Sequence, residues 1–225
     1  MLSQSVQDYL KTIYKLQNLN ALSTVSTTDL SRELKVSGAS VTGMLKRLDT
    51  MGLVSYNSYK GVLLSATGEK IALEVIRHHR LLELYLKEIM GYSLEKVHDE
   101  ACRLEHHISE EFEDKVADLL GNPLYDPHGH PIPTKDGKIE IPDSIPLSDA
   151  NIDTEVIINH LHDDNSTLLA YLEELKLIPN TKLLIREKGP FRGPIKLIKD
   201  GKEILVGHEV SQSIFVSYSN HTINE

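Results

Sequence analysis

Six of the nine prolines in this 225-residue chain lie between residues 121 and 150, among scattered glycine and aspartate. Proline lacks the backbone N–H that a helix interior or a central strand needs, so this segment cannot belong to either. It predicts a linker between two folded parts. Apolar residues recur at helical spacing before it, and short apolar runs bounded by turns follow it. The expected fold class is therefore mainly α with a small β domain at the C-terminal end.

The composition is that of a folded protein without disulfides. Apolar residues make up 40% of the chain and charged residues 25%, which are ordinary globular values. The one cysteine, Cys102, excludes an internal disulfide, and no Cys-x-x-Cys pair is present for a zinc knuckle. No run approaches the ~18 apolar residues of a membrane span, and the first residues do not form a signal peptide. We therefore expect a cytoplasmic protein.

The net charge of −9 is unevenly distributed. Residues 1–70 carry eight Lys/Arg against five Asp/Glu, which gives +3, and the other 155 residues hold 16 basic and 28 acidic side chains, which gives −12. All 11 histidines lie at position 78 or later. This asymmetry favours an N-terminal part that binds phosphates and a remainder that binds something cationic.

Residues 1–66 have the pattern of a winged helix-turn-helix DNA-binding domain. Helical spacing over 5–18, around Leu30, and over 41–48 is followed by two short strands at 53–56 and 61–64. A three-helix core without a ligand would show the same apolar spacing. The surplus of hydroxyl and basic side chains on the third helix and at the hairpin tip favours DNA. The candidate DNA contacts are Thr27, Thr28, Ser37, Ala39, Ser40, Thr42, Lys46, Arg47 and Lys60.

Residues 67–140 predict a helical domain. Amphipathic spacing extends from 67 to 90 and from 93 to 120, and two such helices expose more apolar surface than one monomer covers. We therefore expect a homodimer. After a linker at 141–150, residues 151–225 predict a small, partly open β-barrel, with strands at 155–159, 182–186, 195–198, 203–206 and 214–217 and a helix at 166–176.

Candidate metal ligands concentrate on the two predicted long helices. His79 and Glu83 are four residues apart, and His98 is followed at helical spacing by the three residues Cys102, Glu105 and His106. Imidazole, carboxylate and thiolate on one face suit a first-row divalent metal. Taken singly, each residue could be a solvated surface side chain or a plain core cysteine. His78, about 100° away on the helical wheel, is expected to be an ordinary surface histidine.

Motifs of catalysis are missing. The chain contains no His-Glu-x-x-His, Gly-x-Ser-x-Gly, Walker or Gly-x-Gly-x-x-Gly sequence. Cys102 and His106 could form a thiolate–imidazole pair, but a nucleophile in the middle of a helix rarely faces a substrate cleft. We therefore expect a protein that is not an enzyme.

Four segments give the chain a specific resemblance: Asp8–Tyr14, Val36–Thr42, His79–Glu83 and, above all, Val97-His-Asp-Glu-Ala-Cys-Arg-Leu-Glu-His106. They resemble the diphtheria toxin repressor and manganese transport regulator family of metal-activated transcriptional repressors, in the long form with a C-terminal SH3-like domain. The resemblance covers all three predicted parts of the chain: the DNA-binding domain, the helical domain and the β-barrel. It implies an SH3-like (FeoA-like) fold for the predicted β-barrel.

The resemblance also implies two metal sites. The primary site would use Asp8, Cys102, Glu105 and His106. The second would use His79, Glu83 and His98, completed from the linker or the SH3-like domain. The Asp126-Pro-His128-Gly stretch is similar to a Cys-Pro-His-Gly motif of some members. The candidate ligands from these parts of the chain are Asp126, His128 and Asp164.

The metal itself is expected to be Fe²⁺ or Mn²⁺, with Co²⁺, Ni²⁺ or Zn²⁺ able to substitute. Asp8 matches the manganese branch of the family, whereas Cys102 matches the iron branch, so the ligand set is mixed. Lys11 stands where the short manganese sensors have a glutamate ligand, which argues against a binuclear site.

The resemblance implies a repressor of metal-uptake genes. A divalent metal would act as corepressor, joining Asp8 of the DNA-binding domain to the dimerisation domain, so that the homodimer fits a palindromic operator in double-stranded DNA. The alternative is a winged-helix regulator with an organic effector, in which the His/Glu/Cys face is only structural. A metalloenzyme is a third possibility.

Overall fold

A computed structural model describes residues 2–20, 24–163 and 165–219 of the chain. The chain divides into two compact units, each of which gathers distant segments. The N-terminal unit comprises Met1–His79, Arg103–Glu113 and Pro133–Ile139, and the C-terminal unit comprises Arg80–Cys102, Asp114–Ile132 and Glu140–Glu225. Among the described residues, no helix is both long and apolar enough to cross a membrane.

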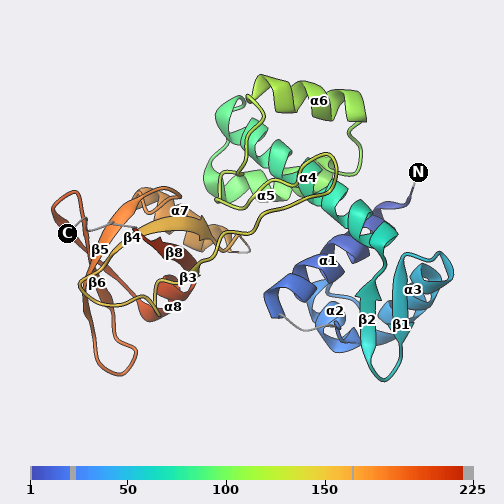
Figure 1. Ribbon diagram of the computed structural model, residues 1–225, viewed down its shortest axis with the longest axis horizontal. Helices are drawn as coiled ribbons and strands as arrows, with labels where there is room; N and C mark the ends of the chain where they lie inside the picture. Colours follow the sequence, from blue (N-terminus) through green and yellow to red (C-terminus); the bar gives the residue numbers. More distant parts are fainter. Residues whose placement is uncertain (1, 21–23, 164, 220–225) are drawn as a thin grey trace, which may run out of the picture. The chain divides into compact units, whose positions relative to one another are not determined.

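The N-terminal unit begins with the predicted winged helix-turn-helix, which is confirmed. Helices α1 (Gln4–Asn20), α2 (Thr27–Glu33) and α3 (Gly38–Thr50) precede a hairpin of β1 (Val54–Asn57) and β2 (Gly61–Leu64). Figure 1 shows this hairpin beside α3. The side chains of Ser26 and Ser37 accept hydrogen bonds from the first-turn amides of α2 and α3, which fixes where both helices begin.

An isolated backbone bridge joins the hairpin to the segment just before α2. Val25 and Val62 exchange two backbone hydrogen bonds of 2.9 Å, next to Gly61 with a φ of +95°. A Cβ at Gly61 would lie 2.4 Å from the Val25 carbonyl oxygen, so only glycine permits this approach. Beneath the hairpin and helices lies one apolar core, whose fully buried members include Leu10, Ile13, Leu30, Val41, Leu45 and Leu48.

Three further helices follow: α4 (Ala66–Glu88), α5 (Leu94–Leu104) and α6 (Glu110–Leu119). The prediction of one helix over 93–120 was wrong, because the chain leaves the helical path between Leu104 and Glu110. Ser109 causes the second start, since its hydroxyl accepts a hydrogen bond from the Phe112 N–H at 3.2 Å. Three glutamates in the first turn of α6 also favour a helix N-terminus there.

The C-terminal unit contains one antiparallel sheet of six strands, in the order β3-β8-β4-β5-β6-β7. Figure 1 shows α7 and α8 beside it. Between its described edge strands the sheet does not close, in agreement with the predicted partly open barrel. Two short elements, β3 and α8, were not predicted. The elements are β3 (Ile145–Pro146), β4 (Glu155–Leu161), α7 (Ser166–Glu174), β5 (Lys182–Lys188), β6 (Ile195–Lys199), β7 (Lys202–Val206), α8 (His208–Gln212) and β8 (Ile214–Tyr218).

Candidate metal centre

Three predicted primary-site residues meet in the N-terminal unit. Asp8 lies on α1, whereas Glu105 and His106 lie in the turn directly after α5 and are buried. His106 Nε2 lies 2.9 Å from Asp8 Oδ1 and 3.2 Å from Glu105 Oε1. One ligand-type atom from each residue falls within 4.8 Å of the others. The cluster thus joins the first helix of the DNA-binding domain to the chain after α5.

The hydrogen bonding of His106 shows what this cluster fits. Its Nδ1 donates to Gln7 Oε1 at 2.7 Å, so the neutral ring keeps the lone pair on Nε2. Nε2 is buried and has no hydrogen-bond partner. Two carboxylate oxygens and the Nε2 atom therefore converge on one point, where a proton on the ring or a bound metal cation makes all three contacts favourable. Nitrogen and oxygen ligands of this kind fit a first-row divalent ion.

Burial and neighbouring charges shift the pKa values of all three residues of the cluster. Burial alone would lower the pKa of His106, but the adjacent carboxylates of Glu105 and Asp8 outweigh it and raise that pKa. Burial raises the pKa of Asp8 despite the opposing charge of His106. Burial of Glu105 is overcome by the adjacent His106 and His79 and by the charge of Lys11, so the pKa of this carboxyl is far below its ordinary value. Glu105 therefore stays ionised, as a metal ligand must.

Two more side chains contact Glu105 inside this unit. Lys11, buried on α1, donates from Nζ to Glu105 Oε1 at 2.9 Å and to Oε2 at 2.7 Å. His79 Nδ1 lies 2.6 Å from Glu105 Oε2. Sequence reasoning placed His79 in the second site and gave Lys11 no partner, so neither contact with Glu105 was predicted.

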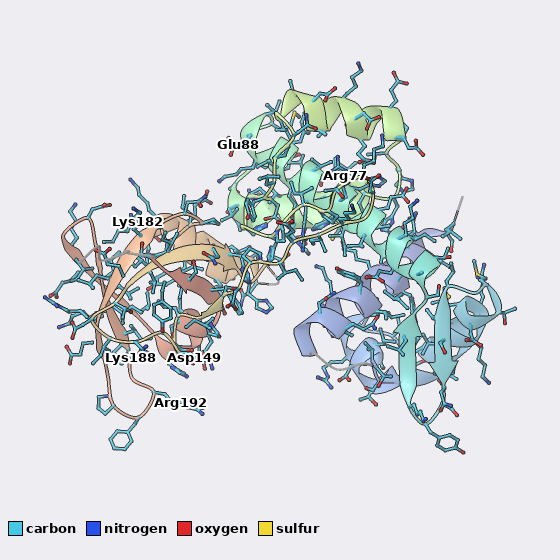
Figure 2. All side chains as sticks on the ribbon, in the orientation of Figure 1. Arg77, Glu88, Asp149, Lys182, Lys188 and Arg192 are labelled. Atoms are coloured by element: carbon cyan, nitrogen blue, oxygen red, sulfur yellow. The ribbon has the colours of Figure 1, made fainter. Side chains whose placement is uncertain are left out.

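His78 is buried, so the prediction of a surface histidine was wrong. Its Nε2 lies 3.0 Å from Glu113 Oε2, and its Nδ1 lies 3.2 Å from the Glu105 carbonyl oxygen. Glu113 also accepts a hydrogen bond of 2.5 Å from Arg77 Nε, the arginine labelled in Figure 2. These contacts lower the pKa of the buried Glu113 carboxyl to about 2, although burial alone would raise it. The break before α6 brings Glu113 to His78.

The C-terminal unit gathers a second group of ligand-type side chains. Glu83 on α4 is fully buried, and His98 Nδ1 on α5 lies 3.2 Å from Glu83 Oε1 and 3.9 Å from Asp163 Oδ2. Cys102 Sγ lies 3.7 Å from His98 Nε2. Asp163 was not predicted, and the predicted Asp164 lies outside the described residues.

The Asp126-Pro-His128-Gly turn belongs to the same unit. Its loop is closed by Asp126 Oδ1, which accepts the N–H of His128 at 2.8 Å and that of His130 at 3.0 Å. Leu161 N–H of β4 donates to the His128 carbonyl at 2.9 Å. Gly129 has a φ of +89°, and a Cβ there would lie 2.0 Å from the Asn159 carbonyl oxygen. The turn is therefore held against strand β4.

Ligand-type atoms of this turn are buried without hydrogen bonds. These atoms are Asp126 Oδ2, His128 Nδ1 and His130 Nδ1, and they lie close together. His128 Nδ1 is 3.5 Å from Glu83 Oε2, which connects the turn to the Glu83 group. His130, which was not predicted, could have been noticed as the second histidine of Asp-Pro-His-Gly-His. His160 packs on it, with ring centroids 5.1 Å apart, and burial lowers the pKa of His160 to about 4.

The predicted ligand sets are thus divided between the units. Of the primary set, Asp8, Glu105 and His106 lie in the N-terminal unit and Cys102 lies in the C-terminal unit. Of the second set, Glu83, His98, Asp126 and His128 lie in the C-terminal unit. His79 belongs to the N-terminal unit and precedes Glu83 by one turn of α4.

The predicted DNA contacts lie on α2, α3 and the hairpin. Ser37 caps α3 through a hydrogen bond from Ser40 N–H of 3.2 Å, and the Thr42 hydroxyl donates to the Gly38 carbonyl at 2.9 Å. The Ser37 and Thr42 hydroxyls therefore already form hydrogen bonds to the backbone of α3. The side chains exposed on these elements are Thr28, Ser37, Ala39, Ser40, Lys46, Arg47 and Lys60, whereas Thr27 and Thr42 are half-buried.

Comparisons with known proteins match three consecutive parts of the chain to families. The family "Iron dependent repressor, N-terminal DNA binding domain" matches residues 1–62, and "Iron dependent repressor, metal binding and dimerisation domain" matches residues 65–134. The FeoA domain family matches residues 145–218. Together these matches cover the DNA-binding, helical and sheet-containing parts of the chain.

Individual relatives agree with these families. The iron-dependent repressor IdeR of Mycobacterium leprae is 28% identical over 231 residues, covering 96% of this chain and 97% of the relative. The diphtheria toxin repressor of Corynebacterium diphtheriae is 36% identical over 135 residues, covering 60% and 59%. A solved manganese-dependent transcriptional repressor in complex with manganese has a TM-score of 0.89 and 31% identity, covering 95% of this chain and all of that one. The crystal structure of ScaR with bound Zn²⁺ has a TM-score of 0.76 and 31% identity, covering 94% and 98%.

Proposed function

Because the chain belongs to the iron-dependent repressor family of metal-dependent transcriptional repressors, which are not enzymes, we propose that Fe²⁺ or Mn²⁺ is its corepressor. The chain has the DNA-binding domain and the dimerisation domain of that family. We infer that a homodimer binds a palindromic operator and thereby represses metal-uptake genes. We also infer that the protein acts in the cytoplasm. Each α3 would enter a major groove, and the two copies must then lie ~34 Å apart.

The observation that carries the proposal is the Asp8–Glu105–His106 cluster, in which His106 Nε2 is buried among acceptors without a hydrogen bond. These three residues would hold the primary ion, with Cys102 as the proposed fourth ligand. When bound, the ion supplies two positive charges between the two carboxylates. Asp8 is then retained by the chain after α5, which restrains α1 and the winged helix built on it.

In the absence of a metal ion α1 would be held less firmly, through the Lys11–Glu105 and Gln7–His106 contacts. Asp8 and Glu105 are like charges brought together by His106, and Lys11 offsets only one of them. The orientation of the winged helices then becomes less restricted, and the ~34 Å spacing is kept for less of the time. Because such coupling is reciprocal, operator DNA raises the affinity for the ion by the factor by which the ion raises the affinity for DNA.

We propose a second metal site in the C-terminal unit, formed by Glu83, His98, Asp163, Asp126 and His128. His79 remains a proposed member, because it precedes Glu83 by one helical turn. Support comes from the buried, unbonded Asp126 Oδ2 and His128 Nδ1 and from the 3.5 Å contact of His128 with Glu83. Because the His128 turn is bonded to β4, this site would attach the linker and the sheet to α4 and α5 within that unit.

The donor set leaves both iron and manganese as candidate signals. The Asp8 carboxylate is a hard ligand that suits Mn²⁺, whereas the Cys102 thiolate is softer and suits Fe²⁺. Relatives of this chain are named for iron in one case and for manganese in another. Co²⁺, Ni²⁺ and Zn²⁺ are expected to substitute, since affinity rises along the Irving–Williams order.

The substitution Asp8→Ala tests the proposal in the full chain. It should abolish operator binding that depends on Mn²⁺ or Fe²⁺, measured by footprinting at controlled free metal, and leave the dimer intact in sedimentation. Gln4→Ala, an exposed change on the same helix, is the matched control. An Asp8→Ala protein that still footprints only after metal is added would refute the role of this cluster. If calorimetry detects no metal binding with or without operator, an organic effector becomes the better explanation.

A further inference from the structure

The hairpin between β5 and β6 ends in a turn that its residues do not favour. Phe191 has a φ of +56° and Arg192 a φ of +58°, and the Gly193 N–H donates to the Pro190 carbonyl at 3.0 Å. Such a type I′ turn usually has Asn-Gly at its two central positions, because a Cβ is crowded at positive φ. Among the described residues, no other two neighbours that both carry a Cβ have positive φ values. Phenylalanine and arginine at this tip thus cost backbone energy, which points to a use for their side chains.

The tip is rigid, and its aromatic ring is in water. Pro190 and Pro194 flank the turn, each with a φ fixed by its own ring, and the Gly189 N–H donates to the Pro194 carbonyl at 2.9 Å. The Phe191 side chain is fully exposed, so it contributes nothing to the apolar core. A ring held in place before binding loses little entropy when a partner covers it, and the covered ring gains apolar contact. The tip therefore has the properties of a binding element.

The charge of the hairpin indicates the kind of partner. Residues 182–203 carry seven Lys/Arg against three Asp/Glu, which gives +4 in a chain whose net charge is −9. Figure 2 labels Lys182, Lys188 and Arg192, which lie along this hairpin, with Arg192 at its end. Lys182 and Arg192 are exposed and form no hydrogen bond or ion pair with the described residues. A basic strip of this kind attracts a polyanion.

Two further cations of the strip are paired only with exposed acids. Arg186 lies 3.0 Å from Asp153, and Lys196 lies 3.3 Å from Glu187. Exposed ion pairs contribute little to stability, so a phosphate can replace either carboxylate at small cost. The hairpin can therefore place several cations along one phosphate backbone.

The side chains at the tip fit the minor groove of DNA. Proteins that bind this groove place arginine in it and insert an apolar wedge, often phenylalanine or proline, between base steps. Residues 190–194 contain arginine, phenylalanine and two prolines, and they lack the asparagine or glutamine that reads adenine in the major groove. The chain also has a DNA-binding domain in residues 1–62, so DNA is a ligand that this protein meets.

We propose that the β5–β6 hairpin is a second DNA-binding element, in which Arg192 enters the minor groove and Phe191 is inserted between two base pairs. The preferred site is a flexible pyrimidine–purine step between A·T pairs, because such a step is the easiest to unstack and the groove there lacks the guanine amino group. The inference goes beyond the proposed function, since residues 182–203 contain none of the proposed metal ligands.

The double substitution Phe191→Asn with Arg192→Gly tests the tip without harming its turn. Asn-Gly is the preferred pair of a type I′ turn, so the Tm of this variant should equal or exceed that of the parent. Its Kd for an alternating A·T duplex should rise about tenfold, the effect of losing one stacked base contact. The Kd for an alternating G·C duplex should change much less. Both are measured on the full chain with Mn²⁺ and with chelator, and the same loss is expected in each.

Single substitutions separate the wedge from the charge. Phe191→Ala should weaken binding to the A·T duplex without changing its salt dependence, and it should abolish the rise in fluorescence that a 2-aminopurine base gives when it is unstacked. Arg192→Gln should reduce the slope of log K against log salt by about 0.9. Lys115→Gln, which removes an exposed charge of the same unit outside the hairpin, is the matched control and should change neither readout.

Two results would overturn the inference. One is an Asn-Gly variant that binds both duplexes with the Kd of the parent, and the tip would then fit a protein partner instead. The other is an equal rise in 2-aminopurine fluorescence for the parent and Phe191→Ala. The role of the Asp8–Glu105–His106 cluster is tested separately by Asp8→Ala, so either proposal can fail while the other stands.

Discussion

The Glu113 carboxylate should make the stability of the metal-free protein depend on pH in a way that Glu113→Gln removes. Hydrogen bonds and charges from His78 and Arg77 lower the pKa of Glu113 from 4.5 to about 2, against the effect of burial. A depressed carboxyl pKa contributes stability that is complete above the unfolded-state value of 4.5 and is lost as pH falls toward 2. The relevant window is therefore pH 5 to pH 2.

The magnitude follows from the shift. Lowering this pKa from 4.5 to about 2 corresponds to at most about 3 kcal/mol at pH 7, of which roughly 1 kcal/mol remains at pH 3. The Glu113 side chain is 4% exposed, so solvent screening reduces this free energy little. The parent should therefore exceed Glu113→Gln by about 2–3 kcal/mol at pH 7, and the gap should narrow by about 2 kcal/mol at pH 3.

Urea unfolding followed by circular dichroism measures this gap, since the chain has no tryptophan to report by fluorescence. Chelator is needed throughout, because a bound metal would add its own stabilisation. Other titrating groups are common to both proteins and largely cancel in the difference. A parent-to-variant gap that stays constant between pH 7 and pH 3 would show that the Arg77–Glu113–His78 network does not stabilise the fold by ionisation.

Two other substitutions test the linker turn and the DNA surface. Gly129→Ala combines a φ of +89° with a Cβ 2.0 Å from the Asn159 carbonyl, so it should destabilise the fold by about 2 kcal/mol or more in thermal unfolding. Gly121→Ala, at a φ of +74° with open space around it, is the control for the backbone conformation alone, and equal losses in both variants would exclude the clash. Lys46→Ala should weaken binding to all DNA sequences alike and reduce the slope of log K against log salt by about 0.9, as expected for one lost phosphate contact. A loss confined to one base position, seen in competition assays, would contradict that role.

Much of the fold could be predicted because the helix-capping and turn residues agree with the spacing of the apolar residues. In the winged helix, the caps Ser26 and Ser37 and the turns at Gly52 and Gly61 mark where each element begins or ends. In the C-terminal unit, turns at Asn180, Asp200 and Gly201 take positive φ values and separate the predicted strands. Short elements such as β3 were missed, since two residues carry no periodicity.

The site was less predictable. The wrong prediction of one helix over 93–120 explains why both the Glu113–His78 contact and the burial of His78 were missed. With 93–120 taken as a single helix, Glu113 would lie two turns beyond His106 and could not reach His78. The buried state of His78 therefore could not be foreseen without the break at Ser109. Ligand candidates were found from spacing and resemblance, but their partners were not. The Lys11–Glu105 contact joins residues 94 positions apart, which no local pattern encodes.

The end of α5 at Leu104 has a consequence for how this protein could be altered. Neighbouring residues in a continuous helix diverge by about 100°, whereas Glu105 and His106 lie just past the last helical turn and have their side-chain atoms 3.2 Å apart. Their meeting thus depends on the peptide chain uncoiling at that point. Substitutions that made α5 and α6 one continuous helix would stabilise the helical domain but separate the Glu105 and His106 side chains, which would weaken metal binding. In the five residues 105–109, higher thermal stability would therefore come with a weaker response to metal.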